Sequence, residues 1–247
     1  MHFALTNDDG YDARGLAELV RVAREYGTTD IVAPLSSQSQ TSHSISLNRT
    51  VSVRSFEHLG LGRVHGVAGR PADCTRLALA GLASGRQPDW VLSGINHGAN
   101  LGVDVYYSGT VAAAREAAIL GVPAAAFSQL IRRPQPVDWE GAGIMAHRVL
   151  EHIFKDGCPP GSFFNINLPA LATGFESAPL VEVPVATEAM PLQYEPVDTP
   201  TEPNAVPEGC IHYRYAGRYL DRGRSPGTDV DVAFADQITI SRINLRM

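Results

Sequence analysis

The chain has 247 residues, 44% of them hydrophobic and 19% charged, and its 20 basic and 26 acidic residues give a formal net charge of −6. This length predicts one large domain, or one core with an extension, that buries a sizeable core. The acidic balance argues against a protein that binds a nucleic-acid duplex, which needs a basic face against the phosphates, but it allows a local anion site.

Lysine occurs only once, as Lys155, so the other basic residues are all arginines. A Walker A loop needs a lysine on a phosphate-binding turn, and kinase and Schiff-base chemistry each need a dedicated lysine. Lys155 lies in the string HIFKDG, at an apparent helix end. The sequence therefore argues against these three classes.

The cysteines and the apolar runs indicate a cytoplasmic protein with no membrane partner. Cys74, Cys158 and Cys210 lie far apart and form no CxxC pair, which is typical of reduced thiols rather than of a disulfide framework or a zinc site. The first residues, MHFALTNDDG, do not have the pattern of a signal peptide. No apolar run approaches the ~20 residues that span a bilayer.

Apolar runs and helical patterns alternate over the first two-thirds of the chain. The runs expected to be buried strands are residues 2–6, 29–34, 89–93, 122–127 and 163–168. The helices expected between them are one with Leu16, Leu19, Val20 and Ala23 on one face, one capped by Asp73, the Ala-rich 110–120 that ends at Gly121, and one marked by Met145, Val149 and Ile153. This alternation predicts an α/β fold with a doubly wound, mostly parallel sheet.

The last third of the chain is rich in proline. Residues 179–207 hold seven of the 17 prolines, which argues against a central strand or a long helix there. Two interpretations stay open, an extended arm or edge hairpin used in subunit contact and a long surface loop. Residues 238–243 alternate as a final strand. We expect an α/β core over residues 1–170 and an extension over 171–247.

Two polar loops follow predicted strands and are candidates for a metal site. Asp8 and Asp9 come directly after the first strand, where open parallel sheets bind their ligands. Adjacent carboxylates repel unless a cation lies beside them, and Mg²⁺ or Mn²⁺ prefers oxygen donors. Asn96 and Asn100 lie in the glycine-rich string SGINHGANLG after the strand 89–93. The alternatives are a helix cap at the aspartates and a turn-rich connector at the asparagines.

A third segment, YSGTVAAA, places Ser108, Gly109 and Thr110 at the start of the Ala-rich helix. Free N–H groups and the helix dipole favour an anion there without any lysine, although an ordinary N-cap explains the same residues. A polar loop, APLSSQSQTSHS, offers several hydroxyls. Hard oxygen ligands beside an anion site suit the hydrolysis of a phosphate ester. His97 is a possible acid in this loop set or an ordinary polar residue.

The strings LTNDDGYDARGL, PADCTRLAL, VLSGINHGANLG and YSGTVAAA resemble the SurE survival proteins, which are 5′/3′-nucleotidases. The resemblance implies a Rossmann-like core, a C-terminal extension used in homodimers or homotetramers, and broad tolerance for phosphomonoesters. It also implies one Mg²⁺ or Mn²⁺ per subunit. The residues that match the family's metal ligands are Asp8, Asp9, Ser39 and Asn96. Those that match its phosphate-binding positions are Asn7, Asn100, Ser108, Gly109 and Thr110, with Asp8 and Asp104 as candidate catalytic groups.

The chain departs from the family pattern at several positions. Leu35 to Gln38 stand where charged residues are usual, and Gln40, Arg14 and Arg70 replace a glycine, a proline and a threonine. The chain also stops at Met247, where many relatives continue. Two other functions therefore remain open: a catalytically altered nucleotide-binding protein of the same fold, and a nucleotide-sugar glycosyltransferase that uses an aspartate pair. We expect Asp8→Asn to lose metal binding but keep the fold, because we take Asp8 to face solvent.

Overall fold

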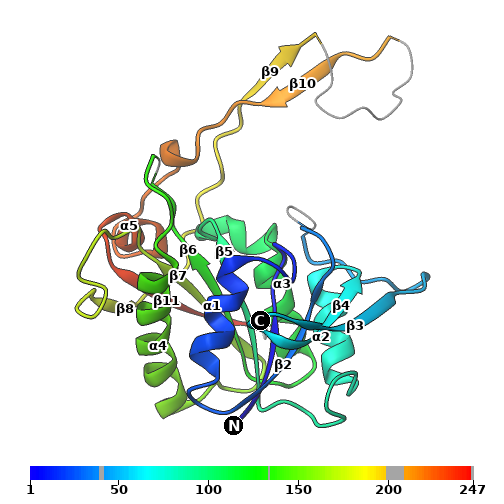
Figure 1. Ribbon diagram of the computed structural model, residues 1–247. Helices are drawn as coiled ribbons and strands as arrows, with labels where there is room; N and C mark the ends of the chain where they lie inside the picture. Colours follow the sequence, from blue (N-terminus) through cyan, green and yellow to red (C-terminus); the bar gives the residue numbers. More distant parts are fainter. Residues whose placement is uncertain (39–41, 133, 199–208, 246–247) are drawn as a thin grey trace.

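The computed structural model describes residues 1–38, 42–132, 134–198 and 209–245. They form a nine-stranded sheet covered by helices, and a separate two-stranded sheet (Figure 1). The strands are β1 (His2–Thr6), β2 (Thr28–Pro34), β3 (Ser52–His58), β4 (Gly62–Ala68), β5 (Trp90–His97), β6 (Ala124–Gln129), β7 (Ser162–Leu168), β8 (Leu180–Glu182), β9 (Tyr194–Val197), β10 (His212–Tyr215) and β11 (Ile238–Asn244). The helices are α1 (Arg14–Ala23), α2 (Pro71–Leu79), α3 (Gly109–Ile119), α4 (Trp139–Asp156) and α5 (Asp229–Phe234), with 3₁₀ turns η1 (Gly102–Tyr106) and η2 (Tyr219–Asp221).

The large sheet has the order β3-β4-β2-β1-β5-β6-β7-β11-β8. The six strands from β4 to β7 run parallel to one another, which confirms the predicted mostly parallel α/β sheet. β1 lies between β2 and β5, so the strand order reverses beside β1. In open α/β sheets such a reversal leaves a crevice at the carboxyl ends of the strands, and ligands bind there.

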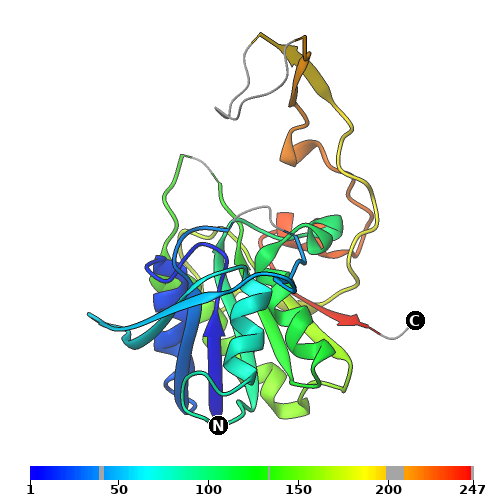
Figure 2. The ribbon, with the colours of Figure 1, turned by 90° about the vertical axis from the view of Figure 1, so that its right-hand side faces the viewer.

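Helices cover both faces of this sheet (Figure 2). Phe3 and Leu5 of β1 belong to a buried cluster with α1 and α4, whereas Ala4 belongs to a second cluster with α2 and α3. This division follows from the geometry of a strand, because successive side chains point to opposite faces. β1 is buried along its whole length, as expected for a central parallel strand.

Two local features differ from the expectations. The hairpin of β3 and β4 was not expected, although β4 pairs with β2 inside the sheet. β3 is a partly exposed edge strand, so its sequence lacks the apolar run that marks the central strands. Asp73 contributes to the cap of α2 from the third helical position and not as the N-cap: Arg70 is the N-cap, and the Asp73 side chain accepts a hydrogen bond from the Arg70 N–H at 3.0 Å.

Residues 171–247 contribute to both sheets. β11 pairs antiparallel with β7 and parallel with β8, so the last strand belongs to the main sheet. β9 and β10 pair with each other in the two-stranded sheet, which projects away from the main body (Figure 1). The division of the chain at residue 170 stays a prediction. None of the helices in the described residues is both long enough and apolar enough to cross a membrane.

Candidate active site

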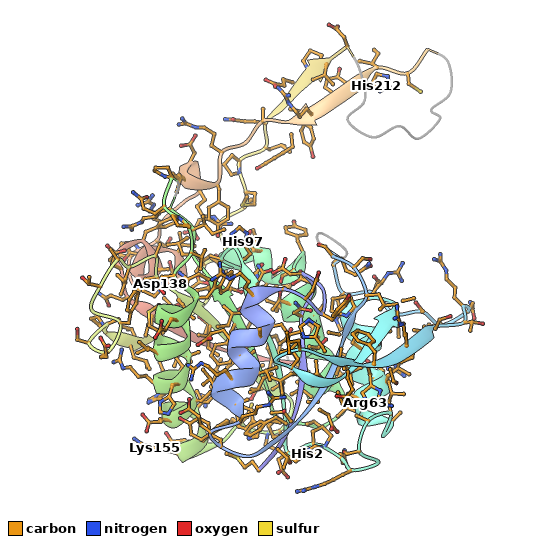
Figure 3. The ribbon with its side chains drawn as sticks, in the orientation of Figure 1. His2, Arg63, His97, Asp138, Lys155 and His212 are labelled. Carbon is orange, nitrogen blue, oxygen red and sulfur yellow. The ribbon has the colours of Figure 1, made fainter. Side chains whose placement is uncertain are left out.

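The loops that follow β1 and β5 meet around a hollow of about 320 Å³. Figure 3 shows His97, at the end of β5, at the opposite end of the main body from His2, which begins β1. The hollow therefore lies where the strand order reverses. The side chains that line it are Asp8, Asp9, Asn96, His97, Asn100, Asp104, Tyr107 and Ser108.

Asp8 lies at the base of the site and is only 6% exposed. The expectation that it faces solvent was wrong. The hydroxyl of Thr110 donates a hydrogen bond to Asp8 Oδ1. Gly109 makes this approach possible, since a Cβ there would lie 2.8 Å from the Asp8 Cβ and 3.0 Å from Asp8 Oδ2. The start of α3 therefore fixes the orientation of the Asp8 carboxylate.

The charge of Asp8 is poorly compensated. Burial raises the pKa of Asp8 to about 6, against the opposing hydrogen bond from Thr110, and the neighbouring charge of Asp9 adds to the rise. No lysine or arginine is among the described residues that line the hollow. The protein thus holds two adjacent carboxylates in a hollow whose described lining residues include no lysine or arginine.

Asp9 and Asn96 lie on opposite loops of the same hollow. Asp9 Oδ2 accepts a hydrogen bond from the His97 backbone N–H at 2.9 Å, which joins the loop after β1 to the end of β5. The Asn96 amide nitrogen donates to the Gly98 carbonyl at 2.7 Å. That bond leaves the amide oxygen of Asn96 as its free acceptor, and oxygen is the atom that a hard cation takes.

Asn100 is held in place by polar side chains from β6 and β7. Its backbone N–H donates to Asn167 Oδ1 at 2.8 Å, and its carbonyl accepts from Asn165 and Asn167 at 2.9 and 3.1 Å. Its side-chain NH₂ group donates to Ser128 Oγ at 2.8 Å. Because a serine hydroxyl either donates or accepts, the opposite orientation of the amide, with its NH₂ group towards the hollow, keeps a hydrogen bond to Ser128.

Asp104 lies in η1 and also lines the hollow. Both of its oxygens accept hydrogen bonds from the Arg222 guanidinium, at 2.7 and 2.8 Å. Asp104 Oδ2 also accepts from the Leu101 N–H at 3.1 Å and from the Tyr219 hydroxyl at 3.2 Å. Burial raises the pKa of the Tyr219 phenol, and the charge of Asp104 adds to the rise, so the hydroxyl stays a donor. Asp104 is therefore a fully bonded carboxylate, in contrast to Asp8.

The residues expected to bind phosphate occupy two different layers. Ser108 lines the hollow and is the N-cap of α3, with its Oγ accepting from the Val111 N–H at 3.1 Å. Thr110 is fully buried behind it. Asn7 is also fully buried, and its side chain donates to the Gly10 carbonyl at 2.7 Å. Asn7, Gly109 and Thr110 thus support the loops and do not line the hollow.

The serine expected as a metal ligand, Ser39, lies outside the described residues. The residue before it, Gln38, donates its backbone N–H to the Asp8 carbonyl at 2.7 Å. The loop after β2 therefore reaches the loop after β1 at the position where the sequence leads into Ser39. In the described part of the chain, no three His, Cys, Asp or Glu side chains gather in a way that could hold a metal.

The donor set nevertheless fits a divalent cation. Asp8 and Asp9 supply two carboxylates and Asn96 supplies a neutral oxygen, which are the donors that Mg²⁺ and Mn²⁺ prefer. A cation would also favour the charged form of Asp8, whose burial now opposes it. Two carboxylates alone would repel a phosphate dianion, and a bound cation would offset this repulsion.

The sequence analysis did not identify several residues that support the site. Arg222, Asn165, Asn167 and Ser128 hold Asn100 and Asp104 but are remote from them along the chain. Asn165 and Asn167 did carry a signal, because two asparagines with a spacing of two share one face of a buried strand and need partners there. Arg222 carried none, since it lies among other exposed-looking charges in the last third of the chain.

Comparison with known proteins gives concordant results. A model of the family described as "Survival protein SurE" matches residues 3–187. A protein of Paramagnetospirillum magneticum named 5′-nucleotidase SurE is 35% identical over 98% of this chain and 88% of its own. Its namesake in Syntrophobacter fumaroxidans is 35% identical over 99% of this chain and 93% of its own. The crystal structure of the SurE protein from Aquifex aeolicus superposes with a TM-score of 0.83 at 27% identity, covering 100% of this chain and 94% of that one.

Proposed function

The chain belongs to the SurE family, and from that premise we propose that it hydrolyses nucleoside monophosphates to a nucleoside and inorganic phosphate, with one divalent cation per subunit. One observation carries the proposal. The aspartate pair, two asparagines and the N-cap of α3 line a single hollow at the reversal of the strand order, and no lysine or arginine is among its described lining residues. This arrangement suits a phosphate that arrives together with a cation.

Asp8, Asp9 and Asn96 would hold the cation, with Ser39 as the fourth expected ligand. Magnesium or manganese suits these oxygen donors. When bound, such a cation lowers the pKa of a water molecule and offsets the charge of the phosphoryl group. Thr110 keeps the Asp8 carboxylate in the orientation that this role requires.

The phosphate would be held by groups from the loop after β5 and from the start of α3. The Ser108 hydroxyl accepts from the Val111 N–H, so its own hydrogen is free to donate to a phosphoryl oxygen. The Asn100 NH₂ group would donate beside it once Ser128 donates to the Asn100 oxygen. The first turn of α3 adds the positive end of the helix dipole. Such prearranged donors stabilise the charge that develops during phosphoryl transfer.

Asp8 and Asp104 are the two candidates for proton transfer. Asp8 borders the hollow, and Thr110 donates a hydrogen bond to one of its oxygens. Asp104 has both oxygens occupied by Arg222, with Tyr219 and the Leu101 N–H as further donors. We therefore assign proton transfer to Asp8 and the positioning of residues 101–108 to Asp104. The proton-transfer role expected for Asp104 stays a prediction.

The experiment is a phosphate-release assay with 5′-AMP, 3′-AMP and p-nitrophenyl phosphate, with Mn²⁺ or Mg²⁺ and with excess chelator. We expect release from all three compounds with the cation and none with the chelator. The same release in the chelator would contradict the cation requirement. Binding of AMP without release from any compound would instead favour the alternative, a nucleotide-binding protein without catalytic activity.

The two-stranded arm is proposed to bind other copies of the chain, as a homodimer or a homotetramer. Its large apolar side chains are exposed, which favours burial in an assembly. They include Leu192 (89% exposed), Tyr194 (60%), Ile211 (75%), Tyr213 (62%) and Leu220 (63%). Sedimentation analysis of the chain with Ile211→Asp and Tyr213→Asp should give a monomer, and an unchanged assembly would contradict this role.

The free cysteines favour the cytoplasm as the location of the protein.

A further inference from the structure

A second hollow opens directly beside the candidate active site. It has a volume of about 370 Å³ and lies between the start of α1, the end of β5 and the start of α4. Its lining residues are Asp9, Ala13, Arg14, Gly15, His97 and Trp139. Asp9 and His97 line the active-site hollow as well, so the two hollows are adjacent and share a border. A molecule bound at Asp9 therefore lies next to both.

The second hollow is bordered by aromatic side chains. The rings of His97 and Trp139 have centroids 6.1 Å apart and planes inclined by 37°. His97 is exposed and Trp139 is half-buried, so their rings remain accessible. Arg14 adds an exposed guanidinium at the same opening. A flat heterocycle stacks well on such rings and on a guanidinium plane, without a requirement for one particular base.

The position of Trp139 is well defined by its neighbours. It is the first residue of α4, whose N-cap, Asp138, accepts a hydrogen bond from the Gly141 N–H at 2.9 Å. Figure 3 shows Asp138 at the same end of the molecule as His97. Gly15 makes room for the indole, because a Cβ there would lie 2.7 Å from its Cζ3 and 1.9 Å from the Ile95 carbonyl oxygen. The indole therefore lies against the first turn of α1.

We propose that this second hollow binds the base of the nucleotide, with Trp139 and His97 as the stacking platform and Arg14 as an additional contact. This inference rests on the proposed function, since it takes the phosphate to lie beside Asp8 and Asp9. A larger hollow of about 620 Å³, between the loops after β6 and β7, shares no lining residue with the active-site hollow. It is therefore less suited to the base of the same substrate.

A comparison of two substrates tests the stacking role. AMP and ribose 5-phosphate share the phosphate and the sugar but differ in the base. We expect Trp139→Ala to lower the ratio of kcat/KM for AMP to that for ribose 5-phosphate by about 10- to 100-fold, mainly through the KM for AMP. Trp139→Phe should retain part of the ratio. Leu171→Ala, in the larger hollow, is the matched control and should leave the ratio as it is.

Tryptophan fluorescence gives a second readout that needs no turnover. The chain has two tryptophans, and Trp90 is 6% exposed and packed against Phe154 and Phe164. In a Trp90→Phe protein, adenosine should quench the remaining Trp139 emission, whereas ribose 5-phosphate should not. No quenching by adenosine, or an unchanged substrate ratio in Trp139→Ala, would overturn the inference. Absence of hydrolysis of both compounds with intact adenosine quenching would instead reject the proposed activity and leave this binding site supported.

Discussion

Two aspartates that line the same hollow have opposite environments. Asp8 is buried, lies beside a second carboxylate and has a pKa raised to about 6 by its burial. Asp104 is paired through both oxygens with Arg222 and accepts two further hydrogen bonds. The difference shows how one residue type serves two purposes: an uncompensated carboxylate attracts a cation, and a compensated one fixes a loop.

The largest expected effect on activity comes from substitution of Asp8. Asp8→Asn removes a charged cation ligand, so phosphate release from AMP should fall by at least about 10²–10³-fold. The protein should remain folded, because asparagine has nearly the same shape. Asp12→Asn, an exposed aspartate on the same loop, is the matched control and should retain activity. Comparable activity in the two variants would remove Asp8 from the mechanism.

Substitutions of Arg222 test the role of its ion pair with Asp104. Arg222→Ala leaves Asp104 without its cation in a site where the two side chains are 3% and 14% exposed. We expect a loss of about 3–5 kcal/mol in the free energy of unfolding, and activity lower by about 10- to 100-fold. Arg222→Lys should recover only part of both losses, since lysine does not reproduce the two-point contact.

Denaturant unfolding and steady-state kinetics measure the two effects of the Arg222 variants. Adding Asp104→Asn to Arg222→Ala should restore part of the stability, because it removes the uncompensated charge. A double variant less stable than Arg222→Ala alone would contradict the stabilising role of the ion pair between Arg222 and Asp104.

The pH dependence of stability in a chelated sample tests the raised pKa of Asp8. This pKa is about 6 in the folded chain, above the ordinary aspartate value of 3.8, so the folded state favours the protonated form. Its ionisation therefore costs stability as the pH rises from about 4 to about 6, by about 3 kcal/mol in total. Asp8→Asn should be more stable than the wild type at pH 7.5, and this advantage should shrink towards pH 4. An advantage that does not change with pH would contradict the raised pKa.

The smallest effects are expected at the asparagines of β7. Asn167 makes two hydrogen bonds to the Asn100 backbone and Asn165 makes one. Asn167→Ala should cost about 1–3 kcal/mol in the free energy of unfolding, because it leaves the buried Asn100 N–H without a partner. Asn165→Ala should cost less. Equal costs, measured by denaturant unfolding, would show that the number of bonds to Asn100 does not determine the effect.

The central sheet was predictable because its strands are buried on both faces. β1, β5 and β7 each appear in the sequence as a short apolar run, and the helices between them show apolar residues at helical spacing. β3 was not predictable in this way, because an edge strand exposes half of its residues. Local pattern therefore predicted most of the interior strands but missed the edge strand β3 and its neighbour β4, although β4 pairs with β2 inside the sheet.

The residues of the candidate site also divide into those that local sequence pattern indicated and those that only the fold reveals. Asp8, Asp9, Asn96, Asn100 and Ser108 all follow or precede predicted elements, so the sequence alone indicated that they meet at one end of the sheet. Arg222 meets Asp104 only through the fold, at a separation of 118 residues. The burial of Asp8 likewise depends on α3 packing over the loop after β1, which no local pattern reveals.

The most direct test of the account is anomalous diffraction from crystals grown with Mn²⁺. We expect one strong peak in each subunit, within coordination distance of the Asp8 and Asp9 carboxylates and the Asn96 amide oxygen. A protein that releases phosphate from AMP in the same Mn²⁺ buffer, but shows no peak between these side chains, would contradict it.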